Sequence, residues 1–449
     1  MMQQETNPLV LAKLEQWQDA RFGLMMHWGT YSQWGACESW PICSEPWITR
    51  TMDNYEEYKR AYENLKTTFN PVDFNPEQWA DWAAAAGMKY VVFTTKHHDG
   101  FCMFDTKQTD YKVTDPACPF STNPRANITK ELFDAFRKRD IMIGAYFSKP
   151  DWHSPNYWSP YWATPDRNTN YDPDDNPELW QKFKEFTYRQ IEELVRDYGP
   201  IDILWLDGCW VQPVSAIEKL AHNVEKCKNQ DLAMDDLAAL ARSYQPDLII
   251  VDRWVKGRQE NYLTPEGNIP AEPLPQPWET CMPMAGAWSY YPDDNYKSPR
   301  KLIHQLAEVV SKGGNFLLNI GVDGNGNYPP EAVLRLQAIA SWMNINREAI
   351  HNTRAIAPYI DGKCRLTQGK DGSIYAIYLA DEGESTPPTH ILLTSQNPAV
   401  TACVHLLGCE ELISWQSVGN GILITIPEKF IAATPCNEAW VIKISHIKN

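Results

Sequence analysis

Hydrophobic residues in the first 350 positions form two kinds of segment that alternate along the chain. Short runs that are apolar throughout, such as FGLMMH at 22–27 and YVVFTT at 90–95, predict strands buried on both faces of a sheet. Between them, helical patterns bounded by capping signals predict helices. The predicted strands span 22–27, 90–95, 141–148, 201–206, 248–251 and 316–320, and the predicted helices span 76–87, 129–139, 178–198, 235–244, 298–312 and 331–346.

Repeated strand–helix units over about 250 to 350 residues predict an α/β fold, a (β/α)₈ barrel of the TIM type. Six strands are recognisable, so closure to eight is an inference. A doubly wound open sheet is the alternative. Against it, neither a G-x-G-x-x-G turn nor a Walker loop follows any of the predicted strands.

The pattern changes near Cys364. Runs such as GSIYAIYLA and AWVIKIS are rich in β-formers and are separated by turn signals, which predicts a small antiparallel β-sandwich. We therefore expect a barrel domain over residues 1–352 and a C-terminal β-sandwich over 353–449. Residues 263–283 hold six prolines and form either a structured active-site loop or a linker. Their place inside the barrel pattern favours the loop.

The charge balance excludes several classes of partner. The formal net charge is −16 and no Lys/Arg cluster is present, so neither nucleic acid nor an anionic membrane is an expected partner. No apolar stretch is long enough for a transmembrane helix, and no signal peptide is visible. The expected location is cytoplasmic if the sequence is complete, and periplasmic or secreted if a leader has been removed. The composition leaves the oligomeric state open.

Eleven cysteines, with no C-x-x-C pair, predict free thiols in a reducing compartment and no zinc site. The sequon that begins at Asn127 stands just before a predicted helix, so we expect this residue to be a helix cap.

Polar residues follow the predicted strands, where the active sites of such barrels lie. Asp207 is the most informative of them, because it comes directly after the apolar run ILWL. Asp202 begins the same strand and should face the opposite, stabilising end of the barrel. A helix cap or a buried ion pair is the structural alternative for Asp207, and a nucleophile or a metal ligand is the functional one.

His27, His97 and His98 also follow strands. With Asp207 they could bind a metal ion. However, adjacent residues of a strand point to opposite sides, and the His-x-His pair common after the first strand of barrel metallohydrolases is missing. As donors to substrate hydroxyls, the same histidines need no metal.

Glycoside hydrolysis requires two carboxyl groups. The proline-rich segment and the residues before it supply four further candidates. The chain also has 19 tryptophans, whose indole faces suit sugar-binding clefts, although a Trp-rich core would explain them equally well. The carboxylate candidates are Glu260, Glu266, Glu272 and Glu279.

At these residues the sequence resembles a known family. The ordered segments RFGLMMHWGTYS, KYVVFTTKHHDGFCMFD, DILWLDG, VDRW and SKGGNFLLNIGVDGNG are similar to the signature stretches of glycoside hydrolase family 29, the α-L-fucosidases. The resemblance extends over about residues 15–350, and that family also has a C-terminal β-sandwich.

The resemblance implies a role for individual residues. Asp207 corresponds to the catalytic nucleophile and Glu266 to the acid/base, with Glu279 as the other candidate for the acid/base. The early glutamate of the family is either Glu38 or Glu45, and we favour Glu38. The resemblance implies substrate binding by His27, Trp28, Glu38, His97, His98, Tyr146, Trp205, Arg253, Glu279 and Trp288.

The function implied by the resemblance is that of a retaining exo-α-L-fucosidase, acting on a fucosylated oligosaccharide or glycoside by double displacement. No metal or other cofactor is expected. Some activity on α-L-galactosides is expected too, because a methyl-sized difference gives limited discrimination. The alternatives are a metal-dependent barrel hydrolase that uses His27, His97, His98 and Asp207, and a fucose-binding protein without catalysis.

Overall fold

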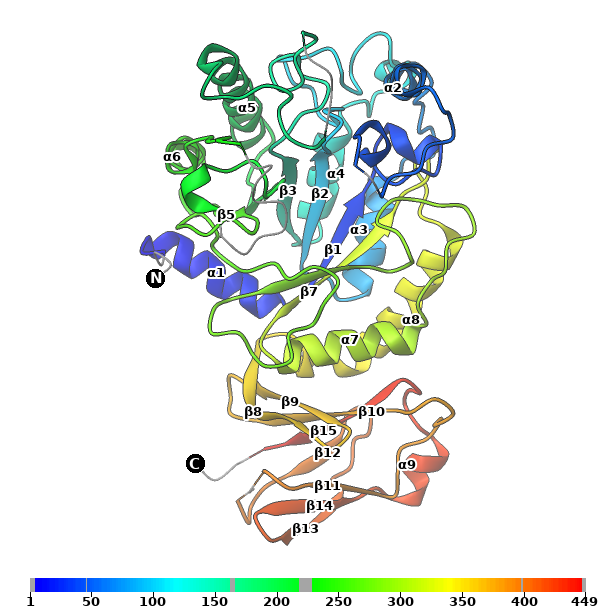
Figure 1. Ribbon diagram of the computed structural model, residues 1–449. Helices are drawn as coiled ribbons and strands as arrows, with labels where there is room; N and C mark the ends of the chain where they lie inside the picture. Colours follow the sequence, from blue (N-terminus) through cyan, green and yellow to red (C-terminus); the bar gives the residue numbers. More distant parts are fainter. Residues whose placement is uncertain (1–4, 46, 162–165, 218–227, 397–398, 446–449) are drawn as a thin grey trace.

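The computed structural model describes residues 5–45, 47–161, 166–217, 228–396 and 399–445. Its larger part is built around a curled, wholly parallel sheet (Figure 1). The strand order is β5-β4-β3-β2-β1-β7-β6. The strands are β1 (Phe22–His27), β2 (Tyr90–Lys96), β3 (Met142–Ser148), β4 (Ile203–Asp207), β5 (Ile249–Asp252), β6 (Glu279–Pro283) and β7 (Asn315–Gly321).

This order confirms the barrel class. Neighbouring strands follow one another around the sheet in chain order, whereas a doubly wound sheet would reverse direction. All six predicted strands are present. The described part of the chain supplies seven regular strands to this sheet, and the edge strands β5 and β6 do not pair with each other.

An irregular segment, residues 259–267, fills the place of the eighth strand. Its backbone hydrogen-bonds to β5 on one side, through Asn261 N to Ile250 O at 3.0 Å. On the other side it bonds to β6, where Glu279 N donates to Leu263 O at 2.8 Å and Gly267 N donates to Cys281 O at 3.0 Å. Pro265 lies within this segment and cannot donate a ladder hydrogen bond, which is a reason for its irregularity.

Helices cover the outside of the sheet (Figure 1). Asparagine side chains begin two of the predicted helices: Asn75 accepts from Gln78 N, and Asn127, as predicted, caps α4 by accepting from Lys130 N. The helices are α1 (Pro8–Ala20), α2 (Tyr55–Glu63), α3 (Pro76–Ala85), α4 (Ile128–Arg137), α5 (Pro177–Asp197), α6 (Met234–Tyr244), α7 (Pro299–Ser311), α8 (Pro330–Asn346) and α9 (Glu428–Ala432).

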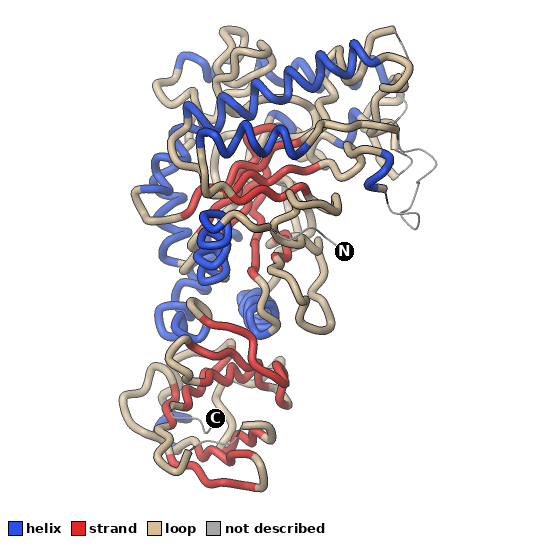
Figure 2. The backbone as a smooth tube through the Cα atoms, turned by 90° about the vertical axis from the view of Figure 1, so that its left-hand side faces the viewer, coloured by secondary structure: helices blue, strands red, loops and turns tan. Residues whose placement is uncertain are grey.

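The C-terminal part has two antiparallel sheets packed on each other, as predicted (Figure 2). Leu366, Ile391, Ile422 and Ile442 belong to the core between them. The larger sheet contains β8 (Thr353–Asp361), β9 (Cys364–Gly369), β10 (Ile374–Leu379), β12 (Val404–Leu406) and β15 (Ala439–Ile444), and the smaller contains β11 (His390–Leu393), β13 (Ser414–Val418) and β14 (Gly421–Thr425).

Buried polar contacts join the two parts of the chain. The guanidinium of Arg21, which is fully buried, donates to the carbonyl oxygens of Thr353 (2.5 Å) and Gly313 (2.5 Å). The indole of Trp342 in α8 donates to Ala439 O at 2.9 Å. The C-terminal sheets therefore support the end of the barrel opposite to the pocket described next.

Candidate active site

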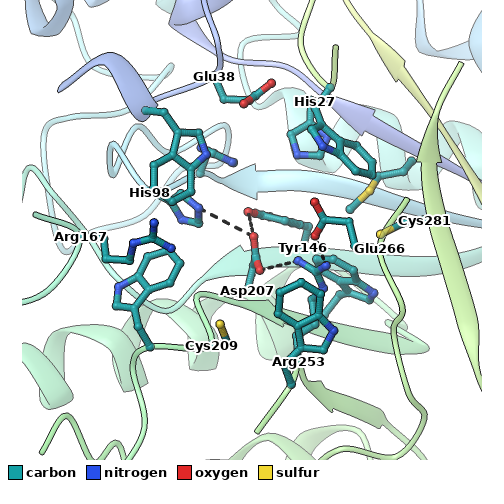
Figure 3. Close-up of a pocket in the computed structure, with 17 residues that line it drawn as sticks. His27, Glu38, His98, Tyr146, Arg167, Asp207, Cys209, Arg253, Glu266 and Cys281 are labelled. Atoms are coloured by element: carbon teal, nitrogen blue, oxygen red, sulfur yellow. Dashed lines mark hydrogen bonds and ion pairs between the residues drawn. The ribbon is translucent and has the colours of Figure 1, made fainter. Parts of the chain in front are cut away.

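A pocket opens at the carboxyl ends of the parallel strands (Figure 3). Its cavity volume is about 230 Å³. The residues that sequence reasoning singled out and that line this pocket are His27, Glu38, His97, His98, Tyr146, Trp205, Asp207, Arg253, Glu266 and Trp288.

Asp207, the last residue of β4, lies at the centre of the pocket (Figure 3). Its Oδ2 accepts a hydrogen bond from the Tyr146 hydroxyl at 2.7 Å, and its Oδ1 accepts one from Arg253 Nη1 at 2.8 Å. Nε2 of His98 lies 3.8 Å from Oδ2. Burial by itself would raise the pKa of Asp207, but Arg253, His98 and the Tyr146 hydroxyl hold it well below its usual range. Asp207 is therefore an ionised carboxylate whose orientation is fixed.

Arg253 links two carboxylates of the pocket, Asp207 and Glu266. Its Nη1 donates to Asp207, and its Nη2 donates to Glu266 Oε2. The guanidinium also packs on the rings of Trp205 and Trp254, with Cζ 4.7 Å and 4.5 Å from the ring centroids. One rigid fork thus sets how far apart the two carboxylates lie.

Glu266 belongs to the irregular segment at 259–267, which confirms that the proline-rich region contributes to the pocket. The Glu266 side chain is 34% exposed, against 18% for Asp207. The Glu266 carboxyl group is therefore more accessible to solvent than that of Asp207.

The three histidines are held as neutral rings. His27 Nδ1 lies 2.7 Å from Asn319 Oδ1, His98 Nδ1 lies 2.8 Å from Ser148 Oγ, and His97 Nδ1 is hydrogen-bonded to Ser39 Oγ. Burial lowers the pKa of all three, that of His98 to about 3. Among the residues that the structure describes, no group of three His, Cys, Asp or Glu side chains could hold a metal ion.

The tautomer of His27 follows from its neighbour. The Asn319 amide donates through Nδ2 to Trp288 O at 2.7 Å, so its Oδ1 faces His27 as an acceptor. His27 must then carry its proton on Nδ1, and Nε2 is left as an acceptor. This ring can accept a hydrogen bond from a sugar hydroxyl.

Glu38 lines the pocket away from the central Asp207 (Figure 3). It is buried, and its Oε1 accepts from Ser289 N at 2.8 Å. Burial raises the pKa of Glu38 to about 7. The other candidate for the early glutamate, Glu45, is not among the lining residues and instead pairs with Arg167 at 2.7 Å.

Two residues assigned to substrate binding lie outside this pocket. Trp28 points away from it, because successive residues at the end of β1 face opposite sides. The Trp28 ring packs with Phe69, Phe74 and Trp79, and its indole donates to Asp323 O at 2.9 Å.

Glu279 is the second of these residues. It is the first residue of β6, so its side chain enters the barrel beneath the pocket. There it accepts hydrogen bonds from the Tyr90 hydroxyl at 2.7 Å and from Trp205 Nε1 at 3.1 Å. Assigning it to the substrate surface from sequence was incorrect, since the carboxyl group has no place among the lining residues.

Sequence reasoning missed several lining residues, most of them in loops. Arg167 packs its guanidinium against the rings of both Trp40 and Trp210, 5.0 Å and 5.1 Å from their centroids. These positions carry no spacing signal, because the loops after different strands bring them together. The lining residues that had no role assigned from sequence are Met25, Trp40, Arg167, Cys209, Trp210, Trp254 and Cys281.

Paired carboxylates in a pocket at the carboxyl ends of a barrel's strands are the arrangement that glycoside hydrolysis requires. Comparison with known proteins identifies the family. The sequence model of the α-L-fucosidases matches residues 1–348, and the model of the α-L-fucosidase C-terminal domain matches residues 359–445. The chain therefore belongs to the α-L-fucosidase family of glycoside hydrolases.

Individual relatives agree with this family over nearly the whole chain. Tissue α-L-fucosidase of Rattus norvegicus is 29% identical over 460 residues, covering 97% of this chain and 90% of the rat protein. The structure of α-L-fucosidase isoenzyme 1 from Paenibacillus thiaminolyticus has a TM-score of 0.78 at 28% identity, covering 98% of this chain and 100% of the other. The Thermotoga maritima α-fucosidase in complex with a mechanism-based inhibitor has a TM-score of 0.71 at 25% identity, covering 95% of both chains.

Proposed function

We propose that the protein is a retaining exo-α-L-fucosidase, with Asp207 as the nucleophile and Glu266 as the acid/base. The observation that carries this proposal is the single guanidinium of Arg253, which bonds to both carboxylates. Retaining glycosidases need these two groups about 5–5.5 Å apart, whereas inverting enzymes leave room for a water molecule. The complex of the Thermotoga maritima enzyme with a mechanism-based inhibitor is a further support.

The reaction proceeds in two displacements. The Asp207 carboxylate attacks C1 of the α-L-fucosyl ring while Glu266 donates its proton to the glycosidic oxygen, so the aglycone leaves as an alcohol. The product of this step is a β-linked fucosyl ester of Asp207. Glu266, now a carboxylate, then takes a proton from water as the water oxygen attacks C1. α-L-Fucose is released and both side chains return to their starting states.

Neutral groups around the pocket suit the sugar hydroxyls. His27 offers an acceptor at Nε2, and the protonated form of Glu38 offers a donor. Met25, Cys281 and Trp288 add apolar surface, against which we expect the methyl group of the 6-deoxy sugar to lie. A methyl-sized difference contributes only about 1–3 kcal/mol, so α-L-galactosides should be slow substrates rather than inert ones.

The first test is hydrolysis of 4-nitrophenyl α-L-fucoside, with and without EDTA, beside the α-L-galactoside. We expect release of nitrophenol that EDTA does not change, with the fucoside about 10–200-fold faster. Loss of activity with EDTA, reversed by adding a divalent metal, would favour the metal-dependent hydrolase instead. Binding of L-fucose without turnover of either glycoside would favour the fucose-binding protein.

The pH dependence should reflect Glu38. Its pKa of about 7 means that the carboxyl group is neutral below this pH and charged above it. The charged form cannot donate to a sugar hydroxyl and adds a negative charge near Glu266. We therefore expect kcat/KM for the fucoside to fall about tenfold per pH unit as the pH rises above 7. In Glu38→Gln this fall in kcat/KM above pH 7 should disappear. A basic limb with the same midpoint in Glu38→Gln and in the parent would contradict this role.

The shape of the pocket and the charge of the chain also bear on the natural substrate. A pocket of about 230 Å³, with Tyr146 and Trp205 among its lining residues, suits a terminal fucosyl residue of an oligosaccharide or glycoside. The negative net charge argues against nucleic acid as a partner.

The cysteines bear on the cellular location. Every described cysteine is a free thiol, which is typical of a reducing compartment, and we propose action in the cytoplasm. Over the described residues, none of the helices is long and apolar enough to cross a membrane.

A further inference from the structure

A fully buried carboxyl group lies beneath the pocket and takes no part in the two displacements. Glu279 accepts a hydrogen bond from the Tyr90 hydroxyl at Oε2 (2.7 Å) and one from the Trp205 indole at Oε1 (3.1 Å). The Tyr262 hydroxyl lies 3.4 Å from Oε1. Three donors from β2, β4 and the segment before β6 thus converge on one side chain.

The indole donor links this carboxyl group to the pocket. Trp205 forms part of the pocket wall, and its register partner on β3 is Tyr146. The two rings are stacked, with centroids 5.3 Å apart and an interplanar angle of 25°. The guanidinium of Arg253 packs on the same indole, 4.7 Å from its centroid.

The side chains of Tyr146 and Arg253 also donate hydrogen bonds to Asp207, at 2.7 Å and 2.8 Å. Both therefore pack on the Trp205 ring, and the only polar atom of that ring is bound by Glu279. A rotation or shift of Trp205 would displace both donors at once. Misplacement by about 1 Å is enough to cost around 100-fold in rate in a preorganised site.

We propose that Glu279 is a positioning residue of the fucosidase reaction: it fixes the Trp205 ring, and through this ring the Tyr146 hydroxyl and the Arg253 guanidinium that orient the nucleophile. The role is distinct from acid/base catalysis, because Glu279 does not line the pocket. It rests on the proposed function, since it assumes that Asp207 is the nucleophile.

Burial raises the pKa of Glu279 to about 7. The groups that face it are Tyr90 from β2, Trp205 from β4, Tyr262, Cys281 from β6 and Arg253. In its neutral form the carboxyl group still accepts the indole N–H, and it does not compete with Asp207 for the charge of Arg253. Glutamine, which is neutral and keeps a carbonyl oxygen, should therefore substitute well.

The test compares Glu279→Gln and Glu279→Leu with the parent enzyme on 4-nitrophenyl α-L-fucoside. We expect Glu279→Gln to keep kcat within about threefold. Glu279→Leu, which lacks the acceptor, should lose about 10–100-fold in kcat with KM changed less than threefold. Looser donors would also stabilise the Asp207 anion less and raise its pKa, so the acid limb of the pH profile should move to higher pH.

Two further variants separate positioning from a general loss of stability. Trp205→Phe removes the indole N–H. Adding Glu279→Leu to the Trp205→Phe enzyme should then lower kcat by less than a further twofold. Glu193 is a matched control: it is a buried glutamate on α5 that accepts from Thr106 Oγ1 at 2.6 Å, outside the pocket. Glu193→Gln and Glu193→Leu should leave kcat and the acid limb unchanged below their melting temperatures. If Glu279→Leu does not fold, Trp205→Phe must by itself shift the acid limb.

Three results would overturn the proposal. One is a kcat and an acid limb in Glu279→Leu that equal those of the parent. Another is a double variant, Glu279→Leu with Trp205→Phe, whose loss in kcat equals the product of the two single losses. The third is rescue of Glu279→Leu by azide with formation of α-L-fucosyl azide, because this would make Glu279 the acid/base. Failure of the parent enzyme to hydrolyse any α-L-fucoside would instead contradict the proposed function, and the two failures are therefore distinguishable.

Discussion

Replacing Asp207 with alanine is expected to lower kcat for 4-nitrophenyl α-L-fucoside by about 10³–10⁵-fold, because no covalent intermediate can then form. Azide should restore part of the rate. The small anion can occupy the space left by the carboxylate and attack C1 from the same side. The product should therefore be β-L-fucosyl azide, which has the inverted configuration and is identified by NMR.

Asp202 provides the control for this experiment. It precedes the same strand, faces the opposite end of the barrel and pairs with Lys13 at 2.6 Å. Asp202→Ala should change thermal stability and leave kcat nearly intact. An Asp207→Ala enzyme that is folded by circular dichroism and keeps a rate within tenfold of the parent would rule out Asp207 as the nucleophile.

The second large effect is expected for Glu266→Ala. For a fucosyl disaccharide, whose leaving group needs protonation, kcat/KM should fall by about 10²–10⁴-fold. The leaving group of 4-nitrophenyl α-L-fucoside departs readily, so formation of the fucosyl ester should be slowed less. Hydrolysis of that ester should then become rate-limiting. A burst of nitrophenol in stopped-flow measurements is the expected signature.

Azide should also accelerate Glu266→Ala, but with the opposite stereochemistry. It attacks the fucosyl ester of Asp207 from the side where water normally enters, so the product should be α-L-fucosyl azide, with configuration retained. Glu272 lies in the same proline-rich region and is exposed, and Glu272→Ala should behave like the parent. Equal losses on the disaccharide and the nitrophenyl glycoside, with no response to azide, would contradict an acid/base role for Glu266.

The sequence predicted those parts of the molecule that follow from burial and strand direction. The six strands were recognisable because both faces of a parallel sheet are apolar, and Asp207 was recognisable because a carboxylate directly follows ILWL. His27, His97 and His98 were recognisable because they, too, directly follow apolar runs. These positions depend on local sequence and on a rule about where barrels place their active sites.

What the sequence left open depends on side-chain direction and on contacts between distant loops. Glu266 and Glu279 lie in one proline-rich stretch, and nothing in their spacing says that one enters the pocket and the other the barrel interior. β6 was missed because ETCMP is short and carries polar residues and a proline. Arg167 meets Trp40 and Trp210 only through the tertiary arrangement of three loops.

The irregular segment at 259–267 has a consequence for protein engineering. The proposed proton donor is carried by the one position of the barrel wall that lacks a regular strand ladder, whereas the nucleophile ends a fully paired strand. Residues 268–276 form a loop that leaves this segment and returns to β6. Backbone hydrogen bonds anchor both ends of the loop: Gly267 N donates to Cys281 O before it, and Leu263 N donates to Pro277 O after it. Sequences of other lengths could be grafted between these anchors without moving Asp207. Preference for the leaving group could thus be redesigned separately from recognition of the fucosyl ring.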